Sequence, residues 1–149
     1  MEKVRFGVVG IGNMGSSHSV KLDQGTVPEI ELTAVCDVKE ERRTWAHDHL
    51  SDRVQIYSDA IEMFEKALLD AVIIATPHYD HPRLVIAALE HNLHVITEKP
   101  AGVYTAAVRE MNEAAAKSNK LFGIMYNQRT NPVYQKIRQL IQEGALGQI

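Results

Sequence analysis

The chain has 149 residues, of which 45% are hydrophobic and 23% are charged. A chain of that length forms one ordinary domain and can bury roughly 68–70% of the surface that it exposes when unfolded. It therefore needs no disulfide or other cross-link to fold. The formal net charge is −3, with 16 basic and 19 acidic residues well mixed. No basic face is therefore offered to a nucleic acid, and we expect none as a partner.

The single cysteine and the short apolar runs indicate the cellular compartment in which the protein works. Cys36 has no second cysteine with which to form an intrachain disulfide. No secretory segment follows the first residue, and runs such as residues 71–75 are far shorter than the ~20 residues of a membrane-spanning helix. We expect a cytoplasmic protein that contacts no membrane.

Short apolar runs alternate along the chain with segments of helical spacing. Val, Ile and Ala occupy successive positions in these runs, which is typical of strands covered by helices on both faces. The alternation predicts an α/β protein with a doubly wound parallel sheet of about six strands. The predicted strands span residues 4–10, 30–37, 54–57, 70–76, 93–97 and 121–127.

Helices are predicted between these strands, and two of them carry clear signals. Pro82 is predicted at the first position of one helix, with His81 at the cap, because proline tolerates the missing amide there. Asn92 is predicted to end that helix, since asparagine enters the left-handed region at little cost. Residues 103–118 form a second helix with an apolar stripe towards the sheet. The stripe consists of Val103, Ala107, Met111 and Ala114.

The first predicted strand leads directly into the sequence GVVGIGNMGSS, which contains G-x-G-x-x-G at a strand-to-helix junction. In a dinucleotide site Gly10 would permit the tight turn, Gly12 would let the backbone approach the pyrophosphate, and Gly15 would let helix and strand pack closely. A glycine turn without a ligand is the alternative. The motif favours a Rossmann fold with strand order 3-2-1-4-5-6. The predicted cofactor-binding residues here are Gly10, Ile11, Gly12, Asn13, Met14 and Gly15.

An acidic residue ends the second predicted strand at a fitting distance from this motif. Asp37 follows Gly15 by 22 residues, close to the ~20 expected for the acid that binds the adenosine ribose. A carboxylate there accepts two hydroxyl groups and repels a 2′-phosphate, so NAD is predicted and NADP is disfavoured. The alternative role for Asp37 is a cap for the helix that follows. Arg42 and Arg43 lie close enough to pair with a phosphate, although solvated charge on a helix face describes them better.

Two further segments end at the same edge of the sheet. Thr76 precedes Pro77 after the fourth predicted strand and must be extended, which keeps the backbone open there. The stretch VITEKPAG follows the fifth predicted strand and places Glu98, Lys99 and Pro100 side by side. Because ligands bind outside the carboxyl ends of parallel strands, the three segments are expected to converge on one crevice.

These motifs together resemble the glucose-fructose oxidoreductase, inositol dehydrogenase and MocA-like oxidoreductase family. The resemblance runs through GVVGIGNMG, CDV, ATPHYDHPRLVIAALEHNLHVITEKPAG and NQRTNPVYQKIRQLIQEGALGQI. It includes His81 and His94 at their accustomed places upstream of the Glu-Lys-Pro tripeptide. Asn92 departs from the family, which usually has glycine there.

The resemblance implies roles at the nicotinamide end of the crevice. It places Lys99 beside the nicotinamide and the substrate hydroxyl, with a cis peptide bond to Pro100, and Glu98 as a residue that orients the loop. An ammonium group there would polarise the substrate oxygen or relay its proton. Asn127 is implied near the nicotinamide, a strand-terminal Asn that satisfies loop amides being the alternative. Lys99 is thus the predicted catalytic residue, and the remaining predicted cofactor-binding residues are Asp37, Thr76, Pro77, His78, His81, Glu98, Lys99, Pro100 and Asn127.

The family also implies an activity, namely hydride transfer between NAD and a sugar, polyol or related cyclic alcohol. Residues 1–127 would form the cofactor domain, and residues 128–149 a linking helix at the start of a substrate domain that this chain lacks. We therefore expect the chain alone to be inactive and the full-length protein to be a homo-oligomer. A stand-alone dinucleotide sensor without turnover is the alternative function.

Seven histidines raise the question of a metal. His47 and His49 are two residues apart and would not share a helix face. His78 and His81 flank the start of a helix, and no cysteine pair or His-Glu helix motif accompanies them. We predict no metal site and assign the histidines to the cofactor crevice and the surface.

Overall fold

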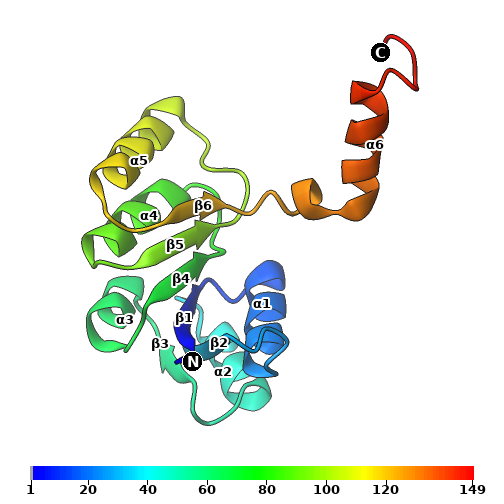
Figure 1. Cartoon of the computed structure of the whole chain (residues 1–149). Coiled ribbons are helices and arrows are strands. Elements are labelled where there is room, and N and C mark those ends of the chain that lie inside the picture. Colours follow the sequence, from blue (N-terminus) through cyan, green and yellow to red (C-terminus); the bar gives the residue numbers. More distant parts are fainter. Residues whose placement is uncertain (1) are drawn as a thin grey trace.

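A computed structural model describes residues 2–149 and contains one six-stranded parallel sheet in the order β3-β2-β1-β4-β5-β6 (Figure 1). The strand order and the α/β class predicted from the sequence are confirmed. The strands are β1 Val4–Val9, β2 Ile30–Cys36, β3 Gln55–Tyr57, β4 Ala71–Ile74, β5 His94–Thr97 and β6 Phe122–Ile124.

Helices cover both faces of the sheet. In Figure 1, α1 and α2 lie on one side of it, and α3, α4 and α5 lie on the other. This arrangement gives the sheet two apolar layers, one under each group of helices. The helices are α1 Asn13–Asp23, α2 Glu40–His49, α3 Ala60–Lys66, α4 His81–Glu90, α5 Thr105–Lys117 and α6 Pro132–Gln142, with a 3₁₀ turn η1 at Asn127–Thr130.

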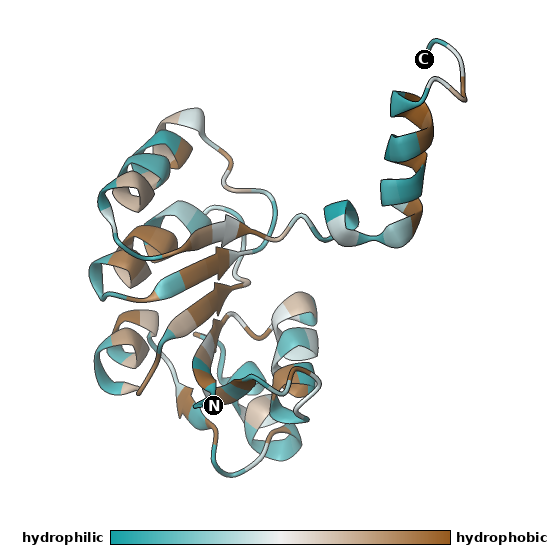
Figure 2. Cartoon of the chain, viewed as in Figure 1, coloured by the Kyte–Doolittle hydropathy of each residue, from teal (hydrophilic) through white to brown (hydrophobic). Residues whose placement is uncertain are grey.

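Neighbouring residues of one strand enter different cores because successive side chains of a strand point to opposite faces. Val8 of β1 packs in the core under α1 and α2, whereas Val9 packs in the core under α3 and α4. Ile73 and Ile74 of β4 divide in the same way. The unbroken apolar runs of the sequence are therefore those of strands buried on both sides, and Figure 2 shows brown segments along the strands of the sheet.

Several predicted boundaries were too generous. Asp37, Thr76 and Asn127 were placed inside strands, but the strands end before them, and Asn127 begins η1. Strand pairing stops where the chain turns out of the sheet, which frees these residues for the carboxyl edge. Val103 was placed on the stripe of α5 but precedes the helix and is 42% exposed, whereas Met111 is fully buried.

The ends of α4 were predicted to within one residue. His81 was predicted as the cap, but it is the first helical residue, and Asp80 precedes it as the N-cap. The Asp80 carbonyl already accepts the first helical hydrogen bond, from Leu84 N at 3.0 Å, so the helix begins one residue earlier. Asn92 adopts φ 62°, which confirms the prediction of a left-handed residue after α4.

The last helix stands apart from the sheet (Figures 1 and 2). Its apolar side chains are exposed, among them Val133 at 64%, Ile137 at 41% and Ile141 at 46%.

Within residues 2–149, no helix is both long enough and apolar enough to cross a membrane.

An ion pair ties β1 to the start of β4 at the edge of the sheet opposite the glycine turn. The Arg5 side chain donates to Asp70 from Nε at 2.8 Å and from a terminal nitrogen at 2.6 Å, and the Arg5 amide donates to it at 2.9 Å. These hydrogen bonds, the guanidinium one foremost, lower the pKa of Asp70 from 3.8 to about 2. The carboxylate form is therefore favoured in the folded chain.

We expect the stabilisation by Asp70 to depend on pH. The pKa of Asp70 is lower in the folded chain than in the unfolded chain. Its contribution to the free energy of unfolding is therefore complete above pH 3.8 and is lost as the pH falls towards 2. Asp70→Asn should therefore lower the melting temperature near neutral pH and have a shrinking effect below about pH 4. Thermal melts of both proteins across this range test the prediction, with the exposed Asp52→Asn as control. A difference that stays constant with pH would contradict it.

Candidate dinucleotide site

The glycine turn connects β1 to α1 through backbone contacts that exclude side chains. Gly10 has φ 86°, a conformation that other residues rarely adopt. A Cβ at Gly10 would lie 2.8 Å from the backbone of Ala75 and Thr76, after β4. A Cβ at Gly15 would lie 1.7 Å from the Gly10 carbonyl oxygen. Two of the three glycines are therefore required by the fold itself.

Gly12 differs from the other two glycines, because a Cβ there would meet no atom within 4 Å. It is also the N-cap of α1, with an extended backbone at φ −71° that other residues adopt freely. No side chain caps α1, and its first turn contains no acidic residue. The open space beside Gly12 and the free amides of the first turn, at Asn13 and Met14, suit a pyrophosphate.

Asp37 lies directly beside this turn. Its Oδ2 accepts a hydrogen bond from Ile11 N at 2.8 Å, and its Oδ1 accepts one from Lys39 N at 2.9 Å. Each carboxylate oxygen keeps further acceptor capacity for a ribose hydroxyl. The alternative role of Asp37, as a cap for the following helix, is supported in part, because its hydrogen bond from Lys39 N orders the turn before α2.

A cavity of about 190 Å³ opens between the ends of β1, β2 and β4. Gly10, Asp37 and Thr76 line it, together with Asp59 and Arg83. The Thr76 hydroxyl is buried and has no hydrogen-bond partner among residues 2–149. Since buried polar groups normally find a partner, this hydroxyl fits a site that a polar ligand completes.

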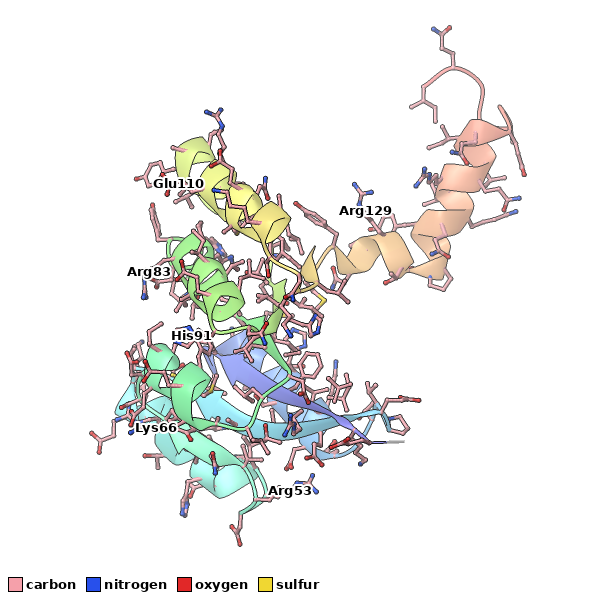
Figure 3. The ribbon with its side chains drawn as sticks, turned by 60° about the vertical axis from the view of Figure 1, so that its left-hand side comes forward. Arg53, Lys66, Arg83, His91, Glu110 and Arg129 are labelled. Carbon is pink, nitrogen blue, oxygen red and sulfur yellow. The ribbon has the colours of Figure 1, made fainter. Side chains whose placement is uncertain are left out.

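A second cavity, of about 580 Å³, lies beside the Glu-Lys-Pro segment. It is bordered by Met14 from α1, by Lys99 and Pro100, and by Asn127 and Arg129 from the segment after β6 (Figure 3 labels Arg129). The Lys99–Pro100 peptide bond is cis. Within residues 2–149 the Lys99 ammonium forms no hydrogen bond or ion pair, so it is available to a ligand in this cavity.

Glu98 is held beneath Lys99 by a residue that the sequence interpretation did not select. Glu98 is 6% exposed, and its carboxylate lies 3.0 Å from His18 Nε2 and accepts a hydrogen bond from Lys99 N at 3.2 Å. His18 is one turn beyond Gly15 on α1. The position of His18 three residues after Gly15 was the signal in the sequence that could have identified it. A helix that starts at the edge of the sheet keeps its first turns near the ends of the neighbouring strands.

The remaining loop residues divide between exposed and buried positions. Pro77 and His78 are exposed after β4. His81 is fully buried, with Nδ1 2.8 Å from the Pro100 carbonyl oxygen and Nε2 2.9 Å from the Thr76 carbonyl oxygen. It therefore connects the two loops that carry the predicted site residues.

The arginines after β2 do not offer a phosphate site as they stand. Arg43 donates to the carbonyl oxygens of Asp37 and Val38 at 2.9 Å each, so its guanidinium supports the backbone around Asp37. Arg42 lies 3.9 Å from the Glu41 carboxylate. No group of three potential metal ligands is present among residues 2–149.

Cys36 lies at the inner wall of the smaller cavity. Burial, which penalises the thiolate, raises the pKa of Cys36 to about 12. The thiol is therefore a neutral apolar surface of the site rather than a nucleophile.

Known proteins similar to this chain include inositol dehydrogenases. It is 32% identical to inositol 2-dehydrogenase from Salmonella typhimurium over 146 residues, which cover 97% of this chain and 43% of that protein. It is 29% identical to myo-inositol 2-dehydrogenase from Thermotoga maritima over 144 residues, covering 97% of this chain and 42% of the relative. The chain thus spans less than half the length of these relatives.

Solved structures match the fold over nearly the whole chain. Scyllo-inositol dehydrogenase from Lactobacillus casei, with bound NAD(H) and scyllo-inositol, superposes with a TM-score of 0.90 at 27% identity, covering 99% of this chain and 43% of that one. The WlbA dehydrogenase from Bordetella pertussis, in complex with NADH and UDP-GlcNAcA, gives 0.89 at 26% identity, covering 99% and 44%.

The model of one protein family matches residues 4–126, which hold the glycine turn, Asp37 and Lys99. That family is described as the Gfo/Idh/MocA oxidoreductases with an NAD-binding Rossmann fold. The match covers most of the chain, and the cofactor it names suits both cavities. The chain therefore belongs to the Gfo/Idh/MocA oxidoreductase family and comprises its NAD-binding Rossmann fold.

Proposed function

We propose that this chain is the cofactor domain of an oxidoreductase that transfers hydride between NAD and a sugar, polyol or related cyclic alcohol. The observation that carries the proposal is the Asp37 carboxylate, held at the rim of the smaller cavity by Ile11 N at 2.8 Å and Lys39 N at 2.9 Å. The substrate class rests on the inositol dehydrogenases among the relatives. We assign residues 1–127 to the cofactor domain and 128–149 to a link towards a substrate domain.

The two cavities hold residues with different roles in binding the cofactor and in catalysis. The amides after Gly12 bind the pyrophosphate, and Asp37 accepts the ribose hydroxyls at the smaller cavity. Thr76 supplies its unpartnered hydroxyl to the same end of the ligand. NAD, when bound, supplies the hydride acceptor or donor.

At the larger cavity Lys99 acts on the substrate oxygen. Its ammonium polarises a carbonyl or alcohol oxygen, or passes a proton to it, while the hydride moves. Glu98 keeps the Lys99 backbone in place through its hydrogen bond from the Lys99 amide at 3.2 Å. Asn127 borders the same cavity, and we assign it to the nicotinamide end.

The same proposal includes the setting of the whole protein. A buried, neutral Cys36 suits a reducing compartment, and we assign the protein to the cytoplasm. We further propose that the full-length protein is a homo-oligomer, as the family resemblance implies.

Titration with both cofactors tests the proposal. The chain should bind NAD(H) more tightly than NADP(H), because the Asp37 carboxylate accepts ribose hydroxyls and repels a 2′-phosphate. Hydrogen bonds to a charged group contribute about 1.5–3 kcal/mol each, so Asp37→Ala should weaken NAD(H) binding by at least about tenfold and reduce the preference over NADP(H). Calorimetry measures both affinities.

A second acidic residue of the same cavity provides the matched comparison. Asp59 caps α3 by accepting from Glu62 N at 2.9 Å, and Asp59→Asn removes its charge while keeping a capping side chain. If Asp37 recognises the ribose, only its replacement changes the cofactor preference. An equal change in both variants, or tighter binding of NADP(H) by the unmodified chain, would refute the assignment. Melting temperatures measured alongside separate lost folding from lost binding.

A further inference from the structure

The buried imidazole of His81 is placed between two hydrogen-bond acceptors. Its Nδ1 lies 2.8 Å from the Pro100 carbonyl oxygen, and its Nε2 lies 2.9 Å from the Thr76 carbonyl oxygen. A backbone carbonyl can only accept a hydrogen bond. Both ring nitrogens are therefore at donor distance from oxygens that cannot donate to them.

A neutral imidazole does not satisfy this arrangement. It carries hydrogen on one ring nitrogen and a lone pair on the other, so either tautomer would press a lone pair against a carbonyl oxygen. His81 is fully buried, and water cannot intervene at these distances. A doubly protonated ring donates both hydrogen bonds, and each is stronger for the charge.

We infer that His81 is an imidazolium in the folded chain and that, by donating to both carbonyls, it fixes the Thr76 loop to the Lys99 loop. The first loop borders the smaller cavity and the second borders the larger one. His81 is thus a positioning residue that couples the two halves of the cofactor site.

Opposing effects are present and need to be outweighed. Burial disfavours the charged ring, and so does its position at the start of α4, where the helix dipole is positive. Two charge-assisted hydrogen bonds oppose them. A neutral ring would make one ordinary hydrogen bond and one repulsive contact, so the geometry favours the cation.

The titratable side chains on the neighbouring elements form no hydrogen bond with the His81 ring that could take the place of its two carbonyl partners. The His78 ring meets the His81 ring edge-on, with centroids 5.6 Å apart. Asp80 pairs with Arg83 at 3.4 Å on the same helix. On the loop that carries Pro100, Lys99 forms no ion pair within the described chain, and Glu98 is paired with His18 at 3.0 Å. No hydrogen bond or ion pair joins any of these side chains to His81 within residues 2–149.

Proton-detected NMR of the ¹⁵N-histidine-labelled chain tests the inference directly. At about pH 7, where a free histidine is mostly neutral, His81 should carry hydrogen on both ring nitrogens. His94 is the internal reference, because its Nδ1 accepts a hydrogen bond from Leu121 N at 2.9 Å and so carries none. A single protonated nitrogen on His81 would overturn the proposal. This measurement needs no ligand and no variant, so it stands even if NAD does not bind.

The coupling of the two loops is tested through cofactor affinity, an arm that rests on the proposed function. His81→Gln keeps one donor and should weaken NADH binding about tenfold, the loss expected of one charge-assisted hydrogen bond.

His91→Gln is the matched control, because His91 lies beyond the far end of α4 with Nδ1 2.7 Å from the Ala87 carbonyl oxygen (Figure 3). It should keep the NADH affinity of the unmodified chain. An unchanged NADH affinity in His81→Gln would refute the coupling. If that variant does not fold, the protonation state measured by NMR decides the proposal.

Discussion

Gly15→Ala should abolish NAD binding and lower the melting temperature by about 10 °C or more. The new methyl group would be built 1.7 Å from the Gly10 carbonyl oxygen and 2.8 Å from its carbon, so backbone rather than a flexible side chain has to move. Overpacking of this kind costs about 3 kcal/mol or more where nothing can yield. Because α1 would shift away from β1, the amides of its first turn would no longer be presented together.

Gly12→Ala is the matched variant, since a methyl group there meets no atom of the chain within 4 Å. Its melting temperature should stay close to that of the unmodified chain, while NAD affinity falls by at least about tenfold because the methyl group occupies the approach to the pyrophosphate. Differential scanning fluorimetry and calorimetry separate the two effects. Undiminished NAD binding by Gly12→Ala would place the pyrophosphate elsewhere.

Lys99→Ala should leave NAD affinity of this chain almost unchanged, because the proposed function assigns the principal contacts to the glycine turn and Asp37. In a polypeptide extended to the length of the relatives, the same change should lower kcat by at least ~10², the lower end expected for acid-base help. The reason is that interactions made only in the transition state alter rate and not cofactor affinity. Reduced nicotinamide absorbance across a sugar and polyol panel gives kcat.

Lys99→Arg should restore little of the lost rate, since a permanently protonated planar group cannot relay a proton. Lys117→Ala, at the end of α5, is the control for removal of an exposed lysine and should be neutral in both measurements. If Lys99→Ala kept a near-normal kcat, the Glu-Lys-Pro segment would be reduced to a structural turn. Turnover by the 149-residue chain alone would equally contradict the division into cofactor and substrate domains.

The fold was predictable because its signals are local and repeated. Unbroken apolar runs such as residues 71–75 are typical of strands buried on both faces, and Gly10 and Asn92 mark turns that need positive φ. The strand ends were less predictable. Apolar residues continue past the last ladder hydrogen bond, so Thr76 and Asn127 read as strand although the chain has already left the sheet.

The placement of the candidate site residues was predictable where a motif fixes both the residue type and the spacing. The glycine turn, Asp37 and the Glu-Lys-Pro segment are of this kind, and the structure brings them to one edge of the sheet. The pairing of His18 with Glu98, at 3.0 Å, joins residues 80 positions apart, so the spacing of His18 after the glycine turn could place it near the strand ends but could not name its partner. The two carbonyl partners of His81 could not be read from the sequence for the same reason.

The hydrogen bond from Ile11 N to Asp37 has a kinetic consequence under the proposed function, because both of its groups belong to the chain itself. If the glycine turn binds the pyrophosphate and Asp37 binds the ribose, this 2.8 Å bond already sets the two groups relative to each other, and the cofactor does not have to order them when it arrives. Association should then proceed at the rate of productive encounters, with no slower rearrangement after it. Variants of this edge should accordingly differ in how long the cofactor remains bound, and little in how fast it enters.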